Sequence, residues 1–593
     1  MKHLSALNKY LLKYKWRLIS GLLFVTLSNL FAVVSPVVVR DVLDEVQSGL
    51  AGYKLLRDTG LARDMKALIF HTVFKSGVLL LILALVRGVF MFFMRQTIIV
   101  MSRHIEYDQK REIYNHYQKL DLHFFKTHFT GDLMNRISED VSRVRMYTGP
   151  SIMYATNLTV LTIMCVWGML RVDQMLTLCV IAPLPLLAFT IYFVNSIIHR
   201  KSEKIQSELS SLTTTAQETY SGIRVIKSFV QERNMLRFFY DTSEKYRKSA
   251  INLSLTEAIY FPSMNLFVGL SMLLTILAGG YLAMKGEVSV GNIAEFVIYI
   301  NMLMFPISSI GWVASMTQRA AVSQKRINEF LHTEPEIQNP LQPITHEITG
   351  NVTFEQVSFT YRHTGIQALK DFSLEIKNGE KIAVIGKTGS GKSTLAHLLL
   401  RMYDVSSGNL LIDGVNVKDF DVTSLRSQIA YAPQEAYLFS DTIFNNICFG
   451  KPDATEAEVK AAARLADLEK DIAHLEKGYE TVVGERGVML SGGQKQRIGL
   501  ARALLKNSRL LLLDSSLSAV DTNTEKTILS NLNGYLHDKT IMVITHRLFT
   551  SWDFDKIVIV EDGRIKEQGT HAELMRLEGY YARLYEQQTV SEV

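Results

Sequence analysis

The chain has 593 residues, which is too long for one ordinary domain and long enough for two or three. Its formal net charge of +6 is small for this length and no dense block of lysine and arginine is present, so the sequence does not indicate a nucleic-acid-binding protein. Hydrophobic residues make up 48% of the chain and the mean hydropathy is +0.11, which indicates that part of it lies in lipid.

The N-terminal segment is basic and amphipathic. Leu4, Leu7, Leu11 and Tyr14 fall on one helical face, and lysines supply positive charge beside them. This pattern predicts a helix lying flat on the cytoplasmic leaflet, with a solvated tail as the alternative. The first apolar stretch begins only after a basic segment and lacks a small-residue cleavage pattern, so we expect it to remain as a membrane helix.

Six apolar stretches are long enough to cross a hydrocarbon core of about 30 Å, which requires about 20 helical residues. They cover residues 18–39, 68–94, 152–170, 176–198, 259–284 and 293–316. The connections after the second and the fourth stretch are long and rich in lysine and arginine, so the positive-inside rule places them in the cytoplasm. The segment 44–66 then lies outside.

The two long connections have helical apolar spacing over residues 95–119 and 201–220. We therefore expect the spanning helices to continue into the cytoplasm and to turn at short cross-pieces near residues 121–128 and 222–231. Arg87 lies within the second apolar stretch. It is either a cation that contacts substrate in a cavity or, as we favour, a side chain near the inner interface.

The character of the chain changes at residues 332–347, where three prolines fall among polar residues and indicate a linker. Beyond it, short strands rich in valine and isoleucine alternate with helices, the pattern of an α/β parallel sheet. The predicted fold is therefore multi-domain. An α-helical six-span transmembrane domain covers residues 1–331, the linker covers 332–347, and an α/β domain covers 348–593.

A P-loop follows the predicted strand 381–385 and leads into an apolar helix. Its residues are Gly386, Lys387, Thr388, Gly389, Ser390, Gly391, Lys392 and Ser393. The glycines let backbone N–H groups converge on phosphate oxygens, and the helix N-terminus adds partial positive charge. Lys392 is expected to reach the β- and γ-phosphates and the Ser393 hydroxyl to meet Mg²⁺. This motif predicts nucleotide binding.

Two further features lie downstream of the P-loop. The strand 510–513 ends in Asp514, a carboxylate in the position of a Mg²⁺ partner. Earlier, Ser491, Gly492, Gly493 and Gln494 open a basic helix, which again offers N–H donors to an anion. Because the P-loop already surrounds one side of a triphosphate, this second anion-binding surface need not serve the same nucleotide.

The segment 490–494 resembles the signature of the ABC ATPases, and the order of motifs over residues 352–584 is similar to that family. The membrane half resembles the type IV exporter arrangement, so the chain is similar to a half-transporter of the multidrug and lipid exporters, and more closely to the degenerate-site subunit of heterodimeric bacterial exporters. The resemblance implies an ABC ATPase domain that binds ATP and Mg²⁺. It implies roles for further residues: Tyr361 stacks on adenine, Thr394 joins the P-loop contacts, Gln434 and His546 assist hydrolysis, and Ser393, Gln434 and Asp514 hold Mg²⁺.

The chain departs from the family pattern at Ser515, where the family has the glutamate that polarises the attacking water. A serine hydroxyl is a poor general base at neutral pH, so hydrolysis at this site is expected to be slow while nucleotide binding persists. Three interpretations stay open. The chain pairs with a partner that keeps the glutamate, which we favour; it forms a slow homodimer in which His546 or Gln434 positions water; or Ser515 is an introduced change that traps the ATP-bound state.

The resemblance implies that two ATP molecules lie between head-to-tail domains, so that Ser491 and Gly493 act on the partner's ATP. The expected function is ATP-driven export by alternating access in the cell (inner) membrane, with the nucleotide-binding domain in the cytoplasm. An ATP-gated channel or regulator is the alternative from another class. The substrate is left open among small molecules, lipids and peptides. The partners are a second half-transporter and membrane lipid, with no nucleic acid.

Overall fold

The computed structural model describes residues 2–55, 61–536, 538–547 and 552–591. The chain divides into two compact units. The first contains residues 1–117 and 131–333, and the second contains residues 118–130 and 334–593. The segment 118–130, which the sequence assigned to the membrane half, therefore groups with the α/β unit. The polypeptide passes from one unit to the other three times.

Within the described residues, six long helical segments are apolar enough to span a membrane: Lys15–Leu55, Ala62–Tyr117, Thr130–Val172, Gln174–Ser221, Glu232–Lys285 and Val290–Leu331. The prediction of six spans is confirmed. The helices of the membrane half are η1 (Lys2–Leu7), α1 (Asn8–Lys13), α2 (Lys15–Leu55), α3 (Ala62–Tyr117), α5 (Thr130–Asn135), η2 (Arg136–Asp140), α6 (Val141–Met146), η3 (Tyr147–Ser151), α7 (Ile152–Val172), α8 (Gln174–Ile181), α9 (Leu184–Ser221), α10 (Ile223–Ser228), α11 (Glu232–Lys285) and α12 (Val290–Leu331).

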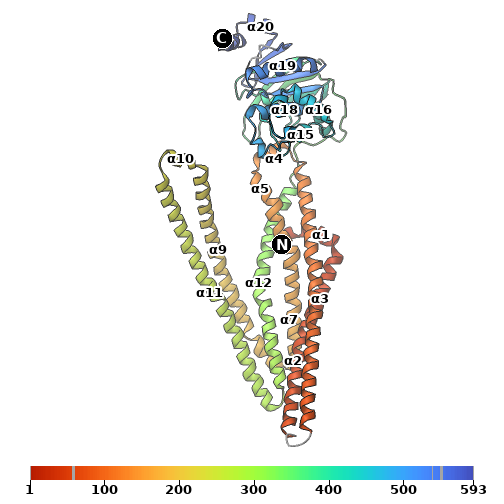
Figure 1. Ribbon diagram of the computed structural model, residues 1–593, viewed down its shortest axis with the longest axis vertical. Coiled ribbons are helices and arrows are strands. Elements are labelled where there is room, and N and C mark those ends of the chain that lie inside the picture. Colours follow the sequence, from red (N-terminus) through yellow and green to blue (C-terminus); the bar gives the residue numbers. More distant parts are fainter. Residues whose placement is uncertain (1, 56–60, 537, 548–551, 592–593) are drawn as a thin grey trace. The chain divides into compact units, whose positions relative to one another are not determined.

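The helices extend well beyond the apolar stretches, as predicted. Helix α3 is 56 residues long and α11 is 54 residues long, far more than the roughly 20 residues needed to cross a bilayer. Helices α9 and α11 run side by side and are joined by the short α10, and α4 (Leu122–Thr127) is the other cross-piece (Figure 1). Both cross-pieces lie where the sequence predicts them.

The N-terminal segment packs differently from the prediction. Leu4 and Leu7 are buried in the protein rather than facing lipid. Two of the lysines expected to contact the cytoplasmic leaflet form ion pairs within the protein instead. The Nζ of Lys9 is 2.7 Å from a Glu112 oxygen, and the Nζ of Lys13 is 2.6 Å from an Asp108 oxygen. The apolar side and part of the charge of this segment are therefore used to attach it to other helices.

The third span also begins earlier than hydropathy indicates. Its helical run starts at Thr130 and contains two wide π-helical turns, η2 and η3, before the apolar stretch. Within this charged part, the buried Asp140 accepts a hydrogen bond of 2.7 Å from Ser323 Oγ and pairs with Arg326 at 3.3 Å. Partners from α12 thus allow a carboxylate to be buried in a long helix.

The second unit contains a four-stranded antiparallel sheet, ordered β2-β1-β4-β5, and a six-stranded sheet, ordered β10-β9-β3-β8-β7-β6. Apart from the antiparallel β9–β10 pair, the six-stranded sheet is parallel. The strands are β1 (Val352–Thr360), β2 (Gln367–Ile376), β3 (Lys381–Ile385), β4 (Ser407–Ile412), β5 (Val415–Asn416), β6 (Ile429–Ala432), β7 (Leu510–Asp514), β8 (Thr540–Thr545), β9 (Lys556–Glu561) and β10 (Arg564–Gly569). The helices are α4, α13 (Lys392–Leu399), η4 (Val417–Asp419), α14 (Val422–Ser427), α15 (Ile443–Cys448), α16 (Glu456–Leu465), α17 (Glu469–Ala473), η5 (Gly478–Glu480), η6 (Glu485–Gly487), α18 (Gly492–Leu505), α19 (Thr522–Tyr535), α20 (His571–Arg576) and α21 (Tyr580–Ser591).

Strand β7 shows why the parallel sheet forms the core. All five of its residues are buried, as expected for a strand that is covered on both faces. Leu510 and Leu512 belong to one hydrophobic cluster, whereas Leu511 and Leu513 belong to another, because successive side chains of a strand point to opposite faces. The sheet is therefore packed between two hydrophobic cores, one on each face, which hold its strands in position.

Candidate functional site

Three loops that carry predicted site residues leave the same edge of the parallel sheet. Strand β8 lies between β3 and β7 and is parallel to both. The P-loop follows β3, Asp514 ends β7, and His546 follows β8. Because the carboxyl ends of parallel strands meet at one edge, the fold brings these residues together where α/β proteins bind ligands.

The P-loop approaches its surroundings too closely for side chains at two positions. A Cβ at Gly386 would lie 2.2 Å from the Val560 carbonyl oxygen, and one at Gly391 would lie 2.2 Å from the Ala368 carbonyl oxygen. Gly391 also has φ +98° and forms the N-cap of α13. Glycine is therefore required here both for space and for backbone conformation, and the loop ends directly at a helix N-terminus suited to phosphate.

Lys392 lies inside the curve of the loop. Its Nζ donates hydrogen bonds to the Gly386 carbonyl at 2.8 Å and to the Lys387 carbonyl at 2.7 Å. Burial lowers the pKa of Lys392, and the carboxylate of Asp514 partly opposes this shift. An ammonium held in this position presents a positive charge, together with the loop N–H groups, to a phosphate group.

Ser393 and Asp514 bring two oxygen-bearing side chains together beside the P-loop. Ser393 Oγ donates to Asp514 Oδ1 at 3.1 Å, and Asp514 is 2% exposed. Burial raises the pKa of Asp514, whereas Ser393 and Lys392 act in the opposite direction. Mg²⁺ prefers oxygen ligands and is usually held by one or two protein side chains with phosphates and water, so this pair fits it. Within the described residues no cluster of three or more His, Cys, Asp or Glu side chains could hold a metal by itself.

Tyr361 lies beside the first turns of α13. Its hydroxyl is 3.0 Å from the Thr394 hydroxyl, and its ring meets that of Tyr403 edge-on with centroids 5.3 Å apart. The structure therefore brings Tyr361 and Thr394 to the P-loop helix. The Gln434 side chain, by contrast, is exposed, and the contact described for this residue is made by its backbone carbonyl.

The second predicted anion-binding surface is a well-formed helix start. Ser491 caps α18 through a capping box: Gln494 N donates to Ser491 Oγ at 3.2 Å, and Ser491 N donates to Gln494 Oε1 at 3.0 Å. A Cβ at Gly493 would lie 2.9 Å from the Ala519 carbonyl oxygen. The described partners of this surface, Ala519 and Asp471, differ from those of the P-loop.

Gln496, one turn into α18, is a site residue that the sequence did not single out. Its Nε2 donates to the Gln434 carbonyl at 3.1 Å and to Ser518 Oγ at 3.0 Å, and its Oε1 accepts from Ala519 N at 2.8 Å. Its Nε2 also lies 3.4 Å from the Ser515 carbonyl oxygen. One amide thus connects the signature helix to the loops that follow β6 and β7.

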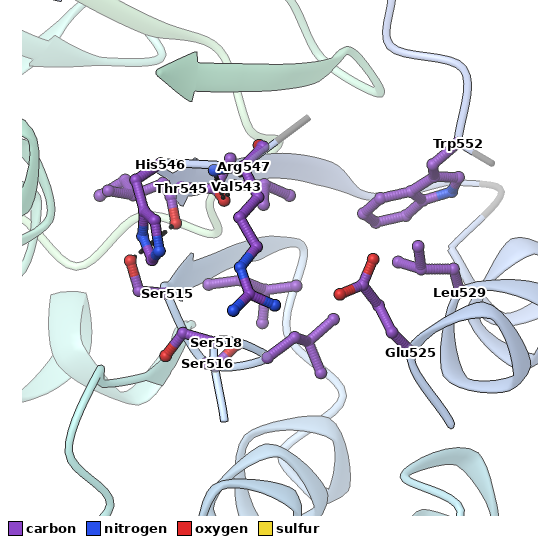
Figure 2. A pocket seen from close by; sticks show the side chains of 13 residues that line it. Ser515, Ser516, Ser518, Glu525, Leu529, Val543, Thr545, His546, Arg547 and Trp552 are labelled. Carbon is purple, nitrogen blue, oxygen red and sulfur yellow. Dashed lines mark hydrogen bonds between the residues drawn. The ribbon is translucent and has the colours of Figure 1, made fainter. Parts of the chain in front are cut away.

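Ser515 and His546 line the same small pocket (Figure 2). Ser515 has φ +46°, and its N–H donates to the Ile544 carbonyl at 2.8 Å. Burial lowers the pKa of His546, and the nearby positive charges of Arg547 and Lys392 act in the same direction, so the imidazole is neutral at neutral pH. In the same view the Arg547 side chain lies in the middle of the pocket, and Glu525 lies on the side opposite Ser515.

Comparison with known proteins matches both units. A family model described as the ABC transporter transmembrane region matches residues 18–307, and one described as ABC transporter matches residues 369–518. A probable multidrug resistance ABC transporter ATP-binding/permease protein of Bacillus subtilis is 38% identical over 468 residues, covering 78% of this chain and 80% of the relative.

A putative multidrug export ATP-binding/permease protein of Staphylococcus aureus is 33% identical over 576 residues, covering 96% of this chain and 97% of the relative. Among solved structures, a bacterial Atm1-family ABC exporter with ATP bound superposes with a TM-score of 0.75 at 27% identity, covering 97% of this chain and 98% of that one. Similarity to multidrug exporters therefore extends over almost the entire chain.

Proposed function

Because this chain belongs to the ABC transporter family, as a multi-pass membrane half-transporter with an ATPase domain, we propose that it exports an amphipathic or hydrophobic substrate across the cytoplasmic membrane by alternating access. In this proposal the chain works as one half of a dimer, preferably with a different half-transporter. Its own ATP site binds ATP and Mg²⁺ but hydrolyses slowly.

The observation that carries the proposal is the contrast between two intact binding surfaces and one missing base. Lys392, Ser393 and Asp514 are arranged for a triphosphate and Mg²⁺, and Ser491 caps a signature helix that is free of distortion. Ser515, in contrast, occupies the position directly after Asp514 at which the family has glutamate. A chain that retains a sound signature but lacks its own base is suited to complete the site of a partner that keeps that base.

Dimerisation is supported by the different surroundings of the two anion-binding surfaces. The P-loop packs against Ala368, Val560 and Asp514, whereas the signature packs against Ala519 and Asp471. A triphosphate bound by one surface leaves the other available for a second molecule. ATP that contacts both surfaces only when two chains are closed around it shifts the population toward the closed dimer.

Coupling to the membrane is supported by the first cross-piece. Asp121 caps α4 and its Oδ2 accepts a hydrogen bond of 2.6 Å from Glu336 N. The rings of His123 and His363 have centroids 5.9 Å apart. His363 follows the adenine-stacking candidate Tyr361 by two residues. Movement of the nucleotide-binding unit is therefore passed directly to α4 and to the helices that continue from it. The second cross-piece leaves Phe229 70% exposed, a surface that we assign to the partner's ATPase domain.

The test separates a heterodimer from a homodimer by two substitutions in this chain. Lys392→Ala weakens ATP binding at its own P-loop, and Ser491→Ala weakens its signature. In a heterodimer, Ser491→Ala is expected to abolish most of the ATPase activity of the purified complex while Lys392→Ala leaves most of it. Equal losses from the two variants would indicate the alternative, a homodimeric lipid or drug flippase with slow hydrolysis.

Transport measured in sealed inverted vesicles separates an exporter from an ATP-gated channel. An exporter accumulates substrate against its gradient when ATP is added outside such vesicles, whereas a channel only equalises the concentrations. Equilibration without accumulation would refute the proposed function.

A further inference from the structure

A carboxylate from α17 holds the first turns of the signature helix α18 at two points. Asp471 Oδ1 accepts a hydrogen bond of 2.9 Å from Gln494 Nε2, and Asp471 Oδ2 lies 2.8 Å from Arg497 Nη1. Gln494 and Arg497 are three positions apart, so they lie on the same side of α18. One side chain from a neighbouring helix therefore fixes both the signature glutamine and the arginine that follows it.

The side-chain amide of Gln494 is held at both ends. Its Oε1 accepts from Ser491 N at 3.0 Å, which completes the capping box, while its Nε2 donates to Asp471. An ionised carboxylate accepts hydrogen bonds and donates none, so Asp471 selects the orientation in which Nε2 faces it. The opposite orientation would place two donors against each other at Ser491. The contact with Asp471 thus favours the capped form of the signature.

The capped form leaves the other donors of the signature available to a phosphate group. Ser491 Oγ accepts from Gln494 N at 3.2 Å, so the hydroxyl can donate its own hydrogen elsewhere. Gly492 and Gly493 follow the N-cap, and N–H groups in the first turn of a helix have no carbonyl partner within that helix. Holding Gln494 in place therefore also holds the donors that a triphosphate would meet.

Arg497 balances the charge that Asp471 brings to this surface. An uncompensated carboxylate beside a phosphate-binding helix start would repel a phosphate group. Arg497 is buried, and its Nη1 also donates to the Asp467 carbonyl at 2.6 Å, in the turn before α17. Removing the Asp471 carboxylate would therefore release Gln494 and also take the ion-pair partner from a buried guanidinium.

We propose that Asp471 is a positioning residue for ATP hydrolysis at the partner's site. It acts through Gln494 and Arg497, which keep the Ser491 hydroxyl and the glycine N–H groups directed at the triphosphate held by the partner's P-loop. This inference rests on the proposed function, in which the signature of this chain acts on the partner's ATP, and it adds the residue that orients the signature.

Exchanging donor and acceptor tests the contact directly. Gln494→Glu retains the capping box, which accepts Glu or Gln at this position, but places a second carboxylate against Asp471. We expect this change to lower the ATPase rate of the purified dimer in nanodiscs about tenfold, the equivalent of one charged hydrogen bond. Adding Asp471→Asn gives the new carboxylate an amide donor and should restore most of the rate. A double variant no faster than Gln494→Glu alone would overturn the inference.

Glu469→Ala is the matched control for Asp471→Ala. Glu469 lies on the same helix, and its Oε1 accepts from Arg464 Nε at 3.1 Å, a contact that includes neither Gln494 nor Arg497. We expect Asp471→Ala to lower the ATPase rate about tenfold and Glu469→Ala to leave it unchanged. Binding of a fluorescent ATP analogue to the chain's own P-loop should be the same in both variants. Equal losses of rate, or a loss of analogue binding in Asp471→Ala, would indicate general damage to the domain and refute the inference.

Ser491→Ala separates failure of this inference from failure of the proposed function. Because Asp471 acts through the signature, Asp471→Ala combined with Ser491→Ala should slow hydrolysis by much less than the product of the two separate losses. Losses that multiply would refute the inference and leave the proposed function intact. A dimer whose ATPase rate is unaffected by Ser491→Ala would refute the proposed function, and the inference with it.

Discussion

Replacing Ser515 with glutamate is the sharpest test of the proposed impairment. The backbone at this position is fixed on both sides: its N–H donates to the Ile544 carbonyl at 2.8 Å, and its carbonyl accepts from Ser518 N at 3.1 Å. A new side chain therefore starts from the same place and direction. Glutamate places its carboxylate two bonds beyond the serine Oγ, about 2.5 Å further from the backbone, with Asp514 and His546 on the adjoining strand ends.

The expected gain follows from general-base catalysis, which contributes about 10²–10⁴-fold to a rate. At 1.36 kcal/mol per tenfold change, that range corresponds to about 3–5 kcal/mol of activation free energy. We expect Ser515→Glu to raise ATP hydrolysis at this site by about 10²-fold, the lower end of the range, because nothing else in the pocket changes. ATP affinity is expected to stay constant, since Lys392 and Asp514 are retained.

The assay is phosphate release by the purified dimer in nanodiscs, with ATP affinity measured separately on the same samples. Ser515→Gln is the matched control because it has the size and shape of glutamate without a base, and both share the φ of +46° at this position. Hydrolysis by the glutamate variant no faster than by the glutamine variant, at equal ATP affinity, would refute the reasoning that the missing base limits the site.

Three other outcomes follow from the P-loop geometry. Lys392→Ala should weaken ATP binding by about 10–100-fold, since charged hydrogen bonds contribute about 1.5–3 kcal/mol, as measured with a fluorescent ATP analogue. Gly391→Ala should prevent ATP binding and lower Tm, because the new Cβ would lie 2.2 Å from a carbonyl oxygen. Gly389 has φ +84° but no atom within 4 Å of such a Cβ, so Gly389→Ala should cost only about 1–2 kcal/mol of folding free energy. Because burial raises the pKa of Asp514, the charged carboxylate is lost as pH falls through that raised pKa. Mg²⁺-dependent ATP affinity should therefore decline at a higher pH than it would with an exposed aspartate. Asp514→Asn should abolish this decline in the same titration.

The features that the sequence makes easiest to recognise are encoded locally. The P-loop glycines, Lys392 and Ser393 lie within eight residues, so the motif can be recognised from one short segment. The carbonyl oxygens that exclude a side chain at Gly386 and Gly391 belong to Val560 and Ala368, which are distant in the sequence. The six apolar stretches are equally local, because a hydropathy pattern needs no partner to be recognised. Asp514 was predictable because it ends a strand whose burial is evident from four consecutive leucines.

The features that could not be predicted depend on partners distant in the chain. Gln496 reaches the Gln434 carbonyl 62 positions earlier and Ser518 22 positions later, and neither distance is visible in a helix pattern. Leu4 and Leu7 form an apolar face that fits lipid and protein equally well, so the sequence pattern favoured contact with lipid although both side chains are buried in the protein. The early start of the third span was hidden because Asp140 lowers the local hydropathy while Ser323 and Arg326 accommodate it from α12.

The grouping of residues 118–130 with the α/β unit has a practical consequence for dissecting the protein. A soluble fragment cut at the proline-containing linker would begin after α4 and would lose Asp121, which accepts the Glu336 N–H, and His123, which lies beside His363. Such a fragment would expose a surface that is covered in the intact chain. Loss of residues 118–130 would by itself change the nucleotide affinity and the aggregation of the fragment. ATP binding should therefore be measured on the full-length protein, or on a fragment to which this thirteen-residue segment is added in trans.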